Sequence, residues 1–214
     1  MSDLTKNGVE EVRHPLFARI YMRTATGRED RYRRELLSGL SGQVIEVGAG
    51  HGLNFGFYPE GVQRVLAVEP EPLLREKAVE AAAKAPVEVE VIDGVAGDLP
   101  AADESFDAGV ASLVLCSVAD QQRALAELRR VIRRGGALHF YEHVIAHRAV
   151  LRGMQRFADA TFWPRVAGGC HLSRDTEAAI EEAGFTIESR RRFPFTPGPP
   201  VPAIPHILGV ARRH

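Results

Sequence analysis

Short apolar runs alternate along the chain with longer segments in which apolar residues recur every three or four positions. From residue 43 onward, five such runs of five to eight residues are each followed by a polar or helical segment. This alternation is typical of a parallel sheet covered by helices on both faces. The expected strands are 43–47, 64–69, 88–93, 106–113 and 136–143. The predicted fold class is therefore α/β.

Helices are expected between and after these strands, because Pro or Gly follows each helical pattern closely. Their predicted ranges are 73–85, 121–132 and 174–183, and the second is expected to end at Gly135 and Gly136. Two late strands, 186–191 and 206–211, are expected to form a terminal hairpin around a proline-rich segment at 194–205. That segment is either a rigid spacer or a lid.

The first part of the chain has a different pattern, with mixed polar residues and scattered aromatic ones. It predicts one helix through Tyr21 and another over 29–40, so residues 1–42 are interpreted as an N-terminal helical cap. Residues 43–214 are interpreted as one domain. Within it, 144–174 forms an insertion on the expected acceptor side.

A basic amphipathic helix is predicted within this insertion, over 148–163. Arginines recur every four residues on one face, at Arg148, Arg152 and Arg156, whereas Val150, Met154, Phe157 and Thr161 or Phe162 follow the opposite face. Such a helix lies on an anionic membrane surface, covers a lipophilic substrate, or has a solvated arginine face above an ordinary core contact. Phe162 and Trp163 favour an apolar acceptor pocket.

Composition narrows the class of protein. The 214 residues carry 27 basic and 28 acidic side chains, and a chain without a basic excess is not expected to bind nucleic acid. Cys116 and Cys170 form no CxxC pair, the start has no apolar stretch, and the uncharged run 108–119 is shorter than the roughly 20 residues of a membrane-spanning helix. We therefore expect a cytoplasmic protein with no metal ligands.

The strongest local motif is EVGAGHG at 46–52, where an apolar strand runs into a glycine-rich turn. Glycines there allow the backbone to approach a ligand closely. Glu69 follows 21 residues after Gly48, at the end of the next strand, where a carboxylate binds ribose hydroxyls. A dinucleotide site has GxGxxG, whereas the spacing here is GxGxG with Leu53 in place of the third glycine. S-adenosylmethionine, which has no phosphate, fits this turn better than a dinucleotide.

In this light the chain resembles class I S-adenosylmethionine-dependent methyltransferases, on motifs 46–52, 68–70, 99–107 and 128–136. The resemblance implies a Rossmann-like, seven-stranded, mostly parallel sheet with an antiparallel last strand. It also implies that S-adenosylmethionine is bound by Glu46, Gly48, Ala49, Gly50, Asn54, Glu69, Pro70, Ala96, Gly97, Ser112 and Leu113. Val95 stands where such enzymes often carry an adenine-binding Asp, so Asp93 or Asp98 would have to replace that carboxylate.

Within the class, the chain is most similar to the microsomal alkyl-thiol S-methyltransferases and their bacterial relatives. The resemblance rests on GLNFGFYP (52–59), LVLCSV (113–118), YEHV (141–144), GCHL (169–172) and PHI (205–207). It implies a small, lipophilic methyl acceptor such as a thiol, with S-adenosylhomocysteine as the product. The animal enzymes have an N-terminal membrane anchor that this sequence does not show, so their location does not transfer.

Methyl transfer from a sulfonium requires alignment and a dry site more than a strong base. His143, at the end of the fifth expected strand, is the candidate catalytic residue because an imidazole can assist loss of a thiol proton, although a strand-end histidine also commonly bonds backbone. Cys116 is interpreted as a small buried apolar residue. Glu142 and His143 are adjacent on a strand and should point to opposite faces.

Two other functions remain open from the residues alone. An N-methyltransferase acting on an amine or a phospholipid headgroup would carry similar motifs, and a regulator could bind S-adenosylmethionine without catalysis. The sequence leaves the acceptor and the oligomeric state unassigned.

Overall fold

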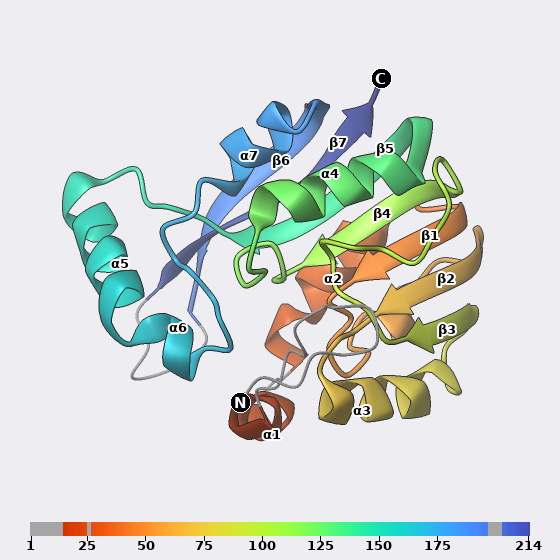
Figure 1. Ribbon diagram of the computed structural model, residues 1–214, viewed down its shortest axis with the longest axis horizontal. Helices are drawn as coiled ribbons and strands as arrows, with labels where there is room; N and C mark the ends of the chain where they lie inside the picture. The colour runs from red at the N-terminus through yellow and green to blue at the C-terminus, as the bar shows by residue number, and fades with distance from the viewer. Residues whose placement is uncertain (1–14, 25–26, 197–202) are drawn as a thin grey trace.

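The computed structural model describes residues 15–24, 27–196 and 203–214, and a seven-stranded sheet organises them (Figure 1). The sheet has the order β3-β2-β1-β4-β5-β7-β6. Its strands are β1 (Gly42–Val47), β2 (Val62–Val68), β3 (Glu88–Ile92), β4 (Phe106–Ser112), β5 (Ile132–His143), β6 (Phe185–Phe195) and β7 (Ile204–Arg213). β7 is antiparallel to both of its neighbours, whereas the other pairs are parallel. The predicted fold class is confirmed.

Helices cover both faces of this sheet. They are α1 (Pro15–Thr24), α2 (Asp30–Leu37), α3 (Pro72–Ala82), α4 (Gln121–Val131), α5 (Ala149–Thr161), α6 (Trp163–Val166) and α7 (Thr176–Glu182), with the 3-10 turns η1 (Gly27–Glu29) and η2 (Phe55–Phe57). One core lies between the sheet and α4 with α7, and includes Leu125, Leu128 and Ile180. The other lies beneath α2 and α3 and includes Leu36, Leu37 and Ala78.

Local sequence explains where several helices begin. Glu71, Asp120 and Asp175 each accept a hydrogen bond from a backbone N–H in the first turn of α3, α4 and α7. Such N-caps satisfy a donor that the helix itself leaves unpaired. The acidic residues before each helix therefore set these three boundaries.

Several element boundaries differ from the sequence predictions, most clearly those of β5, α4 and β6. β5 begins at Ile132, four residues before the expected start, because Ile132 pairs with Phe106 and its side chain is buried. α4 therefore ends at Val131, and Gly135, with φ of +76°, adjusts the strand rather than stopping a helix. β6 continues through Pro194, which an edge strand tolerates because proline, having no N–H, then leaves no strand on its outer side without a hydrogen-bond donor.

The expected terminal hairpin is present as β6 and β7, and its two strands are longer than predicted. They take up residues 194–195 and 204–205 of the proline-rich segment. Residues 197–202 lie outside the described part, so the question of a spacer or a lid is not addressed for them.

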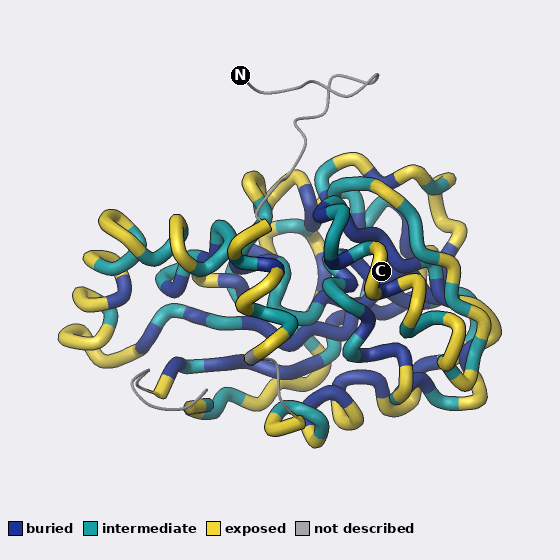
Figure 2. Tube along the Cα trace, turned by 90° about the horizontal axis from the view of Figure 1, so that it is seen from below, coloured by how far each residue is buried: buried dark blue, intermediate teal, exposed yellow. Residues whose placement is uncertain are grey.

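The insertion 144–174 forms an arm made of α5 and α6, which extends from the carboxyl-terminal edge of the parallel strands (Figure 1). Most of this arm is exposed (Figure 2). α1 lies at the same edge, and Phe17 sits so close to Gly168 that a Cβ there would be 2.6 Å from its ring. None of the helices in the described segments has the length and apolar character that a membrane crossing requires.

Candidate active site

The glycine-rich turn lies at the carboxyl end of β1, next to the point where the sheet order reverses between β1 and β4. Ligands of open α/β sheets bind at such a switch point. Gly48 and Gly50 have φ of +62° and +59°, a conformation that residues with a Cβ adopt rarely. A Cβ on Gly48 would lie 2.3 Å from Val114 Cγ2, so the loop after β4 packs directly on this turn.

No α-helix starts at this turn. Residues 51–54 form turns, and the three-residue η2 follows. A dinucleotide site places a pyrophosphate on a helix N-terminus, which this loop does not offer. The backbone therefore agrees with the GxGxG spacing and with a cofactor that has no phosphate.

Glu69 follows β2 and lies beside the turn, as the sequence predicts. Its Oε2 accepts a hydrogen bond from the Gly50 N–H at 2.7 Å, and its Oε1 accepts one from the Glu71 N–H at 2.9 Å. Burial raises the pKa of the Glu69 carboxyl to about 7, although these two backbone donors act to lower it. Each oxygen retains a second lone pair, with which it can accept a hydrogen bond from a ribose hydroxyl.

Glu46 and Asn54 face each other beneath the turn. Asn54 Nδ2 donates to Glu46 Oε1 at 2.7 Å, and the Tyr58 hydroxyl donates to Oε2 at 2.6 Å. Arg33 of α2 donates to Asn54 Oδ1 at 2.9 Å, and burial raises the pKa of Glu46 to about 7. These bonds connect α2 to the glycine turn, so Glu46 and Asn54 support the loop from below.

Among the described residues, the expected adenine side carries no free buried carboxylate. Ala96 is buried and Gly97 is half-buried, in a turn closed by a bridge between Val95 and Asp98. Asp98 is exposed. Asp93 is exposed as well and pairs with Arg75, whose Nη1 also donates to the carbonyl oxygens of Glu69 and of Pro70.

Ser112 and Leu113 end β4 on the other side of the turn. The Ser112 hydroxyl is buried, and neither it nor the buried His51 Nδ1 bonds another group in the described part of the chain. Leu113 has φ of +56°, which is strained for a residue with a branched side chain. The two unpartnered polar atoms beside the glycine turn fit a polar ligand such as S-adenosylmethionine.

His143 ends β5, two residues beyond Tyr141, whose carbonyl accepts the Leu113 N–H at 2.7 Å. Its Nδ1 lies 3.2 Å from Cys170 Sγ, and its ring meets His206 edge-on at 4.5 Å between centroids. Burial lowers the pKa of His143, but its hydrogen bond to Cys170 and the charge there outweigh burial and raise it.

Two residues near His143 were not assigned to the site by sequence reasoning. Cys170 Sγ lies 3.6 Å from Cys116 Sγ, and this hydrogen bond lowers the pKa of Cys170 while raising that of Cys116. Cys116 is buried, as predicted, but its sulfur faces the thiol of Cys170 rather than only apolar side chains. The two cysteines are 54 residues apart, and no motif spacing connects them.

Glu142 precedes His143 on β5, and its side chain bonds the loop after β4. Its carboxylate is fully buried and accepts the backbone N–H groups of Val114, Leu115 and Cys116 at 2.9–3.2 Å. Burial raises its pKa to about 7. This residue therefore holds the loop after β4 in place.

Comparison with known proteins agrees with this geometry. A family model described as a methyltransferase domain matches residues 45–140. The thiol S-methyltransferase TMT1B of Mus musculus is 36% identical over 180 residues, which cover 82% of this chain and 73% of that protein. The phosphatidylethanolamine N-methyltransferase of Cereibacter sphaeroides is 30% identical over 129 residues, covering 57% of this chain and 63% of that protein.

Solved structures show the same fold at low identity. A crystal structure of a Bacillus halodurans protein has a TM-score of 0.71 at 16% identity and covers 88% of this chain and 99% of its own. Taken with the glycine turn, Glu69 and the sheet order, the identity to TMT1B shows that the chain belongs to the class I S-adenosylmethionine-dependent methyltransferases.

Proposed function

We propose that this methyltransferase transfers the methyl group to the sulfur of a small, lipophilic thiol. The observation that carries the proposal is the group of side chains at the end of β5. There the imidazole of His143 lies next to the thiols of Cys170 and Cys116. Within the part of the chain that the structure describes, the carboxylate that precedes His143 on its strand, that of Glu142, already accepts three backbone N–H groups, which leaves it poorly placed to bind a cationic amine. The identity to TMT1B, a thiol S-methyltransferase by name, supports the same acceptor.

S-adenosylmethionine supplies a methyl group that is already activated by the positive sulfur. We propose that Gly48, Ala49 and Gly50 hold its methionine part, with Glu46 and Asn54 bracing the turn beneath. Glu69 and Pro70 then lie at the ribose, and Ala96 and Gly97 at the adenine. Ser112 and Leu113 border the methyl group. These residues bind and orient the two reactants, which is the main requirement of this reaction.

We propose that His143 contributes to catalysis by helping the acceptor lose its proton. Its ring is half-buried at the end of β5, on the same edge of the sheet as Leu113 and the glycine turn. Because Nδ1 faces Cys170, the imidazole does not act alone but as part of a group of three side chains.

The arm of α5 and α6 is the proposed acceptor-side surface. Val150, Met154 and Phe157 are 77%, 60% and 68% exposed, whereas Gln155 is the buried residue of α5. The interpretation of this helix as an arginine face above an ordinary core contact is therefore wrong, because its apolar side faces outward. We propose that this side contacts a lipid surface from which a lipophilic acceptor can enter.

The proposed reaction is tested by measuring S-adenosylhomocysteine formation with mass spectrometry. Purified protein would be incubated with S-adenosylmethionine and separate sets of alkyl thiols, amines, phenols and phospholipids. We expect turnover with thiols, and loss of cofactor binding in Glu69→Ala.

The rival functions predict other results. Turnover with amines or phospholipids alone would favour the N-methyltransferase alternative, to which the similarity to the Cereibacter enzyme gives some support. Tight S-adenosylhomocysteine binding without turnover of any acceptor would favour a regulator.

A further inference from the structure

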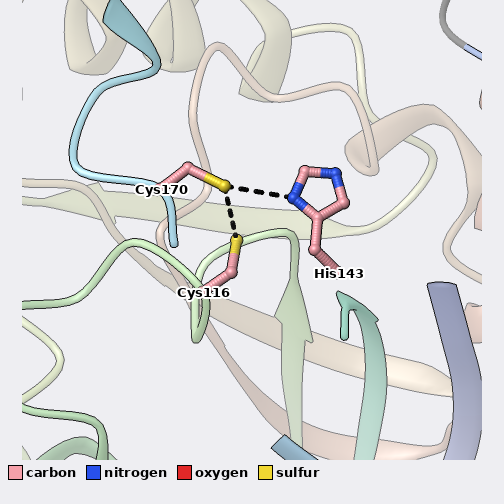
Figure 3. A group of neighbouring side chains, drawn as sticks. All are labelled: Cys116, His143 and Cys170. Atoms are coloured by element: carbon pink, nitrogen blue, oxygen red, sulfur yellow. Dashed lines mark hydrogen bonds between the residues drawn. The ribbon is translucent and has the colours of Figure 1, made fainter. Parts of the chain in front are cut away.

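Cys116, His143 and Cys170 meet at one point although they lie on three separate segments (Figure 3). Cys116 belongs to the loop after β4, His143 ends β5, and Cys170 follows α6. Cys170 Sγ lies 3.6 Å from Cys116 Sγ and 3.2 Å from His143 Nδ1. The three ligand atoms all lie within 4.8 Å of one another, and both sulfurs are buried.

The partner of His143 differs in kind from those of three other histidines. His139, His171 and His206 each place Nδ1 against a backbone carbonyl oxygen, at 2.6–2.8 Å. His143 instead turns Nδ1 toward sulfur. His143 therefore has a thiol partner where these three histidines have backbone partners.

Each of the three segments is fixed by a buried or half-buried side chain that bonds backbone. Glu142 accepts three N–H groups of the Cys116 loop, and Gln155 bonds the Ala146 N–H and the Val144 carbonyl just after His143. Asp159 accepts the N–H groups of residues 172 and 173, just after Cys170. Such supporting bonds are typical of sites that must hold ligands in a set geometry.

The donor set and its spacing suit a thiophilic cation. Two thiolates and one imidazole are ligands that Zn²⁺ prefers, and three protein ligands with one open position are typical of catalytic zinc. With bonds of about 2.3 Å to sulfur and about 2.0 Å to nitrogen, a tetrahedral Zn²⁺ would separate its sulfurs by roughly 3.8 Å and sulfur from nitrogen by roughly 3.5 Å. The observed 3.6 Å and 3.2 Å are close to these values.

The group also lies beside the cofactor turn. Val114, two residues before Cys116, is the residue that packs on Gly48. The His171 N–H donates to the Cys116 carbonyl at 2.8 Å, which draws the segment carrying Cys170 onto the same loop. The three side chains and the cofactor turn are therefore connected through the same loop after β4.

We propose that Cys116, His143 and Cys170 bind Zn²⁺ and that its fourth coordination position takes the sulfur of the acceptor thiol. This inference rests on the thiol acceptor proposed above. A thiol bound to such an ion loses its proton to solvent and remains as a thiolate. The thiolate sulfur then forms a bond to the methyl carbon. The bond from that carbon to the cofactor sulfur breaks, its electron pair stays on that sulfur, and the neutral thioether leaves the ion.

The first test measures metal binding without reference to activity. Full-length protein, reduced and freed of metal, would be titrated with Zn²⁺ and with Co²⁺. We expect one ion per chain, and with Co²⁺ the charge-transfer absorption of thiolate ligands together with the visible bands of a tetrahedral site. Cys116→Ala, Cys170→Ala and His143→Gln should each weaken binding by on the order of 100-fold or more, since losing a direct ligand exceeds the effect of losing a supporting bond.

His147→Gln provides the matched control, because His147 is exposed and lies four residues from His143. It should bind Co²⁺ as the unaltered chain does. Circular dichroism and S-adenosylhomocysteine titration of every variant show whether the fold and the cofactor site are intact. The cobalt spectrum of the unaltered chain does not depend on any variant folding.

The second test connects the ion to the acceptor. Metal-free protein should bind S-adenosylhomocysteine as before but methylate thiols about tenfold or more slowly, with recovery on adding Zn²⁺. A shift of the cobalt bands on adding an alkyl thiol would support coordination of the acceptor.

Three results would overturn the inference, and they separate it from the proposed function. Absence of thiolate-to-cobalt absorption, with both thiols titrating as free or as a disulfide, would remove the metal site. Undiminished thiol methylation by metal-free protein would remove the role of the ion while leaving the thiol acceptor in place. Metal binding without any thiol methylation would remove the proposed acceptor as well.

Discussion

At the scale of single residues, Glu69 shows how burial prepares a carboxylate for one ligand. Its pKa is raised to about 7, mainly by burial. Ribose hydroxyls donate hydrogen bonds most strongly to the ionised form. Cofactor binding should therefore become tighter as the pH rises through the pKa of the free protein. We expect the S-adenosylhomocysteine dissociation constant to fall by roughly tenfold between about pH 6 and pH 8, as measured by calorimetric titration.

Glu69→Gln is the control for this dependence, because an amide keeps the shape of the side chain and does not titrate in this range. It should bind the product more weakly and with little change over the same pH interval. An equally steep pH dependence in Glu69→Gln would assign the titration to another group.

Gly48 allows a second prediction, which separates backbone strain from close packing. Gly48→Ala places a Cβ in a conformation with φ of +62° and 2.3 Å from Val114 Cγ2. We expect it to lower the free energy of unfolding by about 2–4 kcal/mol, combining strain and overpacking, and to abolish cofactor binding. Urea denaturation and product titration measure the two effects.

Gly39→Ala is the matched substitution, since Gly39 has φ of +77° with nothing within 4 Å of a Cβ. It should cost only about 1 kcal/mol and leave cofactor binding unchanged. Equal losses at both positions would mean that contact with Val114 has no effect of its own.

At the scale of elements, α5 shows an apolar side turned toward solvent. Val150, Met154 and Phe157 are exposed on the arm, and Arg148 and Arg156 are exposed beside them. An apolar strip flanked by cations matches an anionic lipid surface. We expect the protein to bind vesicles containing phosphatidylglycerol, less strongly as ionic strength rises, in a sedimentation assay.

A double substitution that places two glutamates on the apolar side of α5 tests this surface. Met154→Glu with Phe157→Glu should weaken vesicle binding by about tenfold or more, whereas Val79→Glu, at an exposed apolar position on α3, should not. A second copy of the chain could cover the apolar side of α5 instead of a lipid surface. Light scattering of the same samples detects such a dimer. If the double substitution left vesicle binding unchanged, the apolar side of α5 would not be a lipid surface. The same conclusion would follow if the unaltered protein were a dimer and the double substitution dissociated it.

The orientation of α5 could not be predicted from the periodicity of its sequence. The amphipathic pattern of 148–163 predicts a helix, and α5 is that helix. Which side faces inward depends on what the rest of the chain offers, and here Gln155 turns inward to bond the backbone of Val144 and Ala146. A polar residue thus takes the buried position that sequence reasoning gave to the core contact.

At the scale of the whole molecule, local patterns predict most of the sheet and the position of Glu69 beside the glycine turn. Apolar runs mark the inner strands β1 and β4 most clearly, because such strands are covered on both faces. The glycine turn and Glu69 are recognisable because each follows directly on a strand. The start of β5 was missed because pairing of Ile132 with Phe106, a tertiary contact, overrides the helical pattern through 132. Cys170 was missed because only folding brings it to His143.

The position of β7 between β5 and β6 has a consequence for how the molecule folds. β6 is synthesised before β7, yet it pairs only with β7, so β5 gains its outer neighbour after residues 144–203 have been made. Until then that edge of β5 is unpaired, and an open edge invites pairing with other chains. We expect the β6–β7 hairpin to form locally and dock late, which makes the segment ending in His143 the part of the nascent sheet most in need of a chaperone.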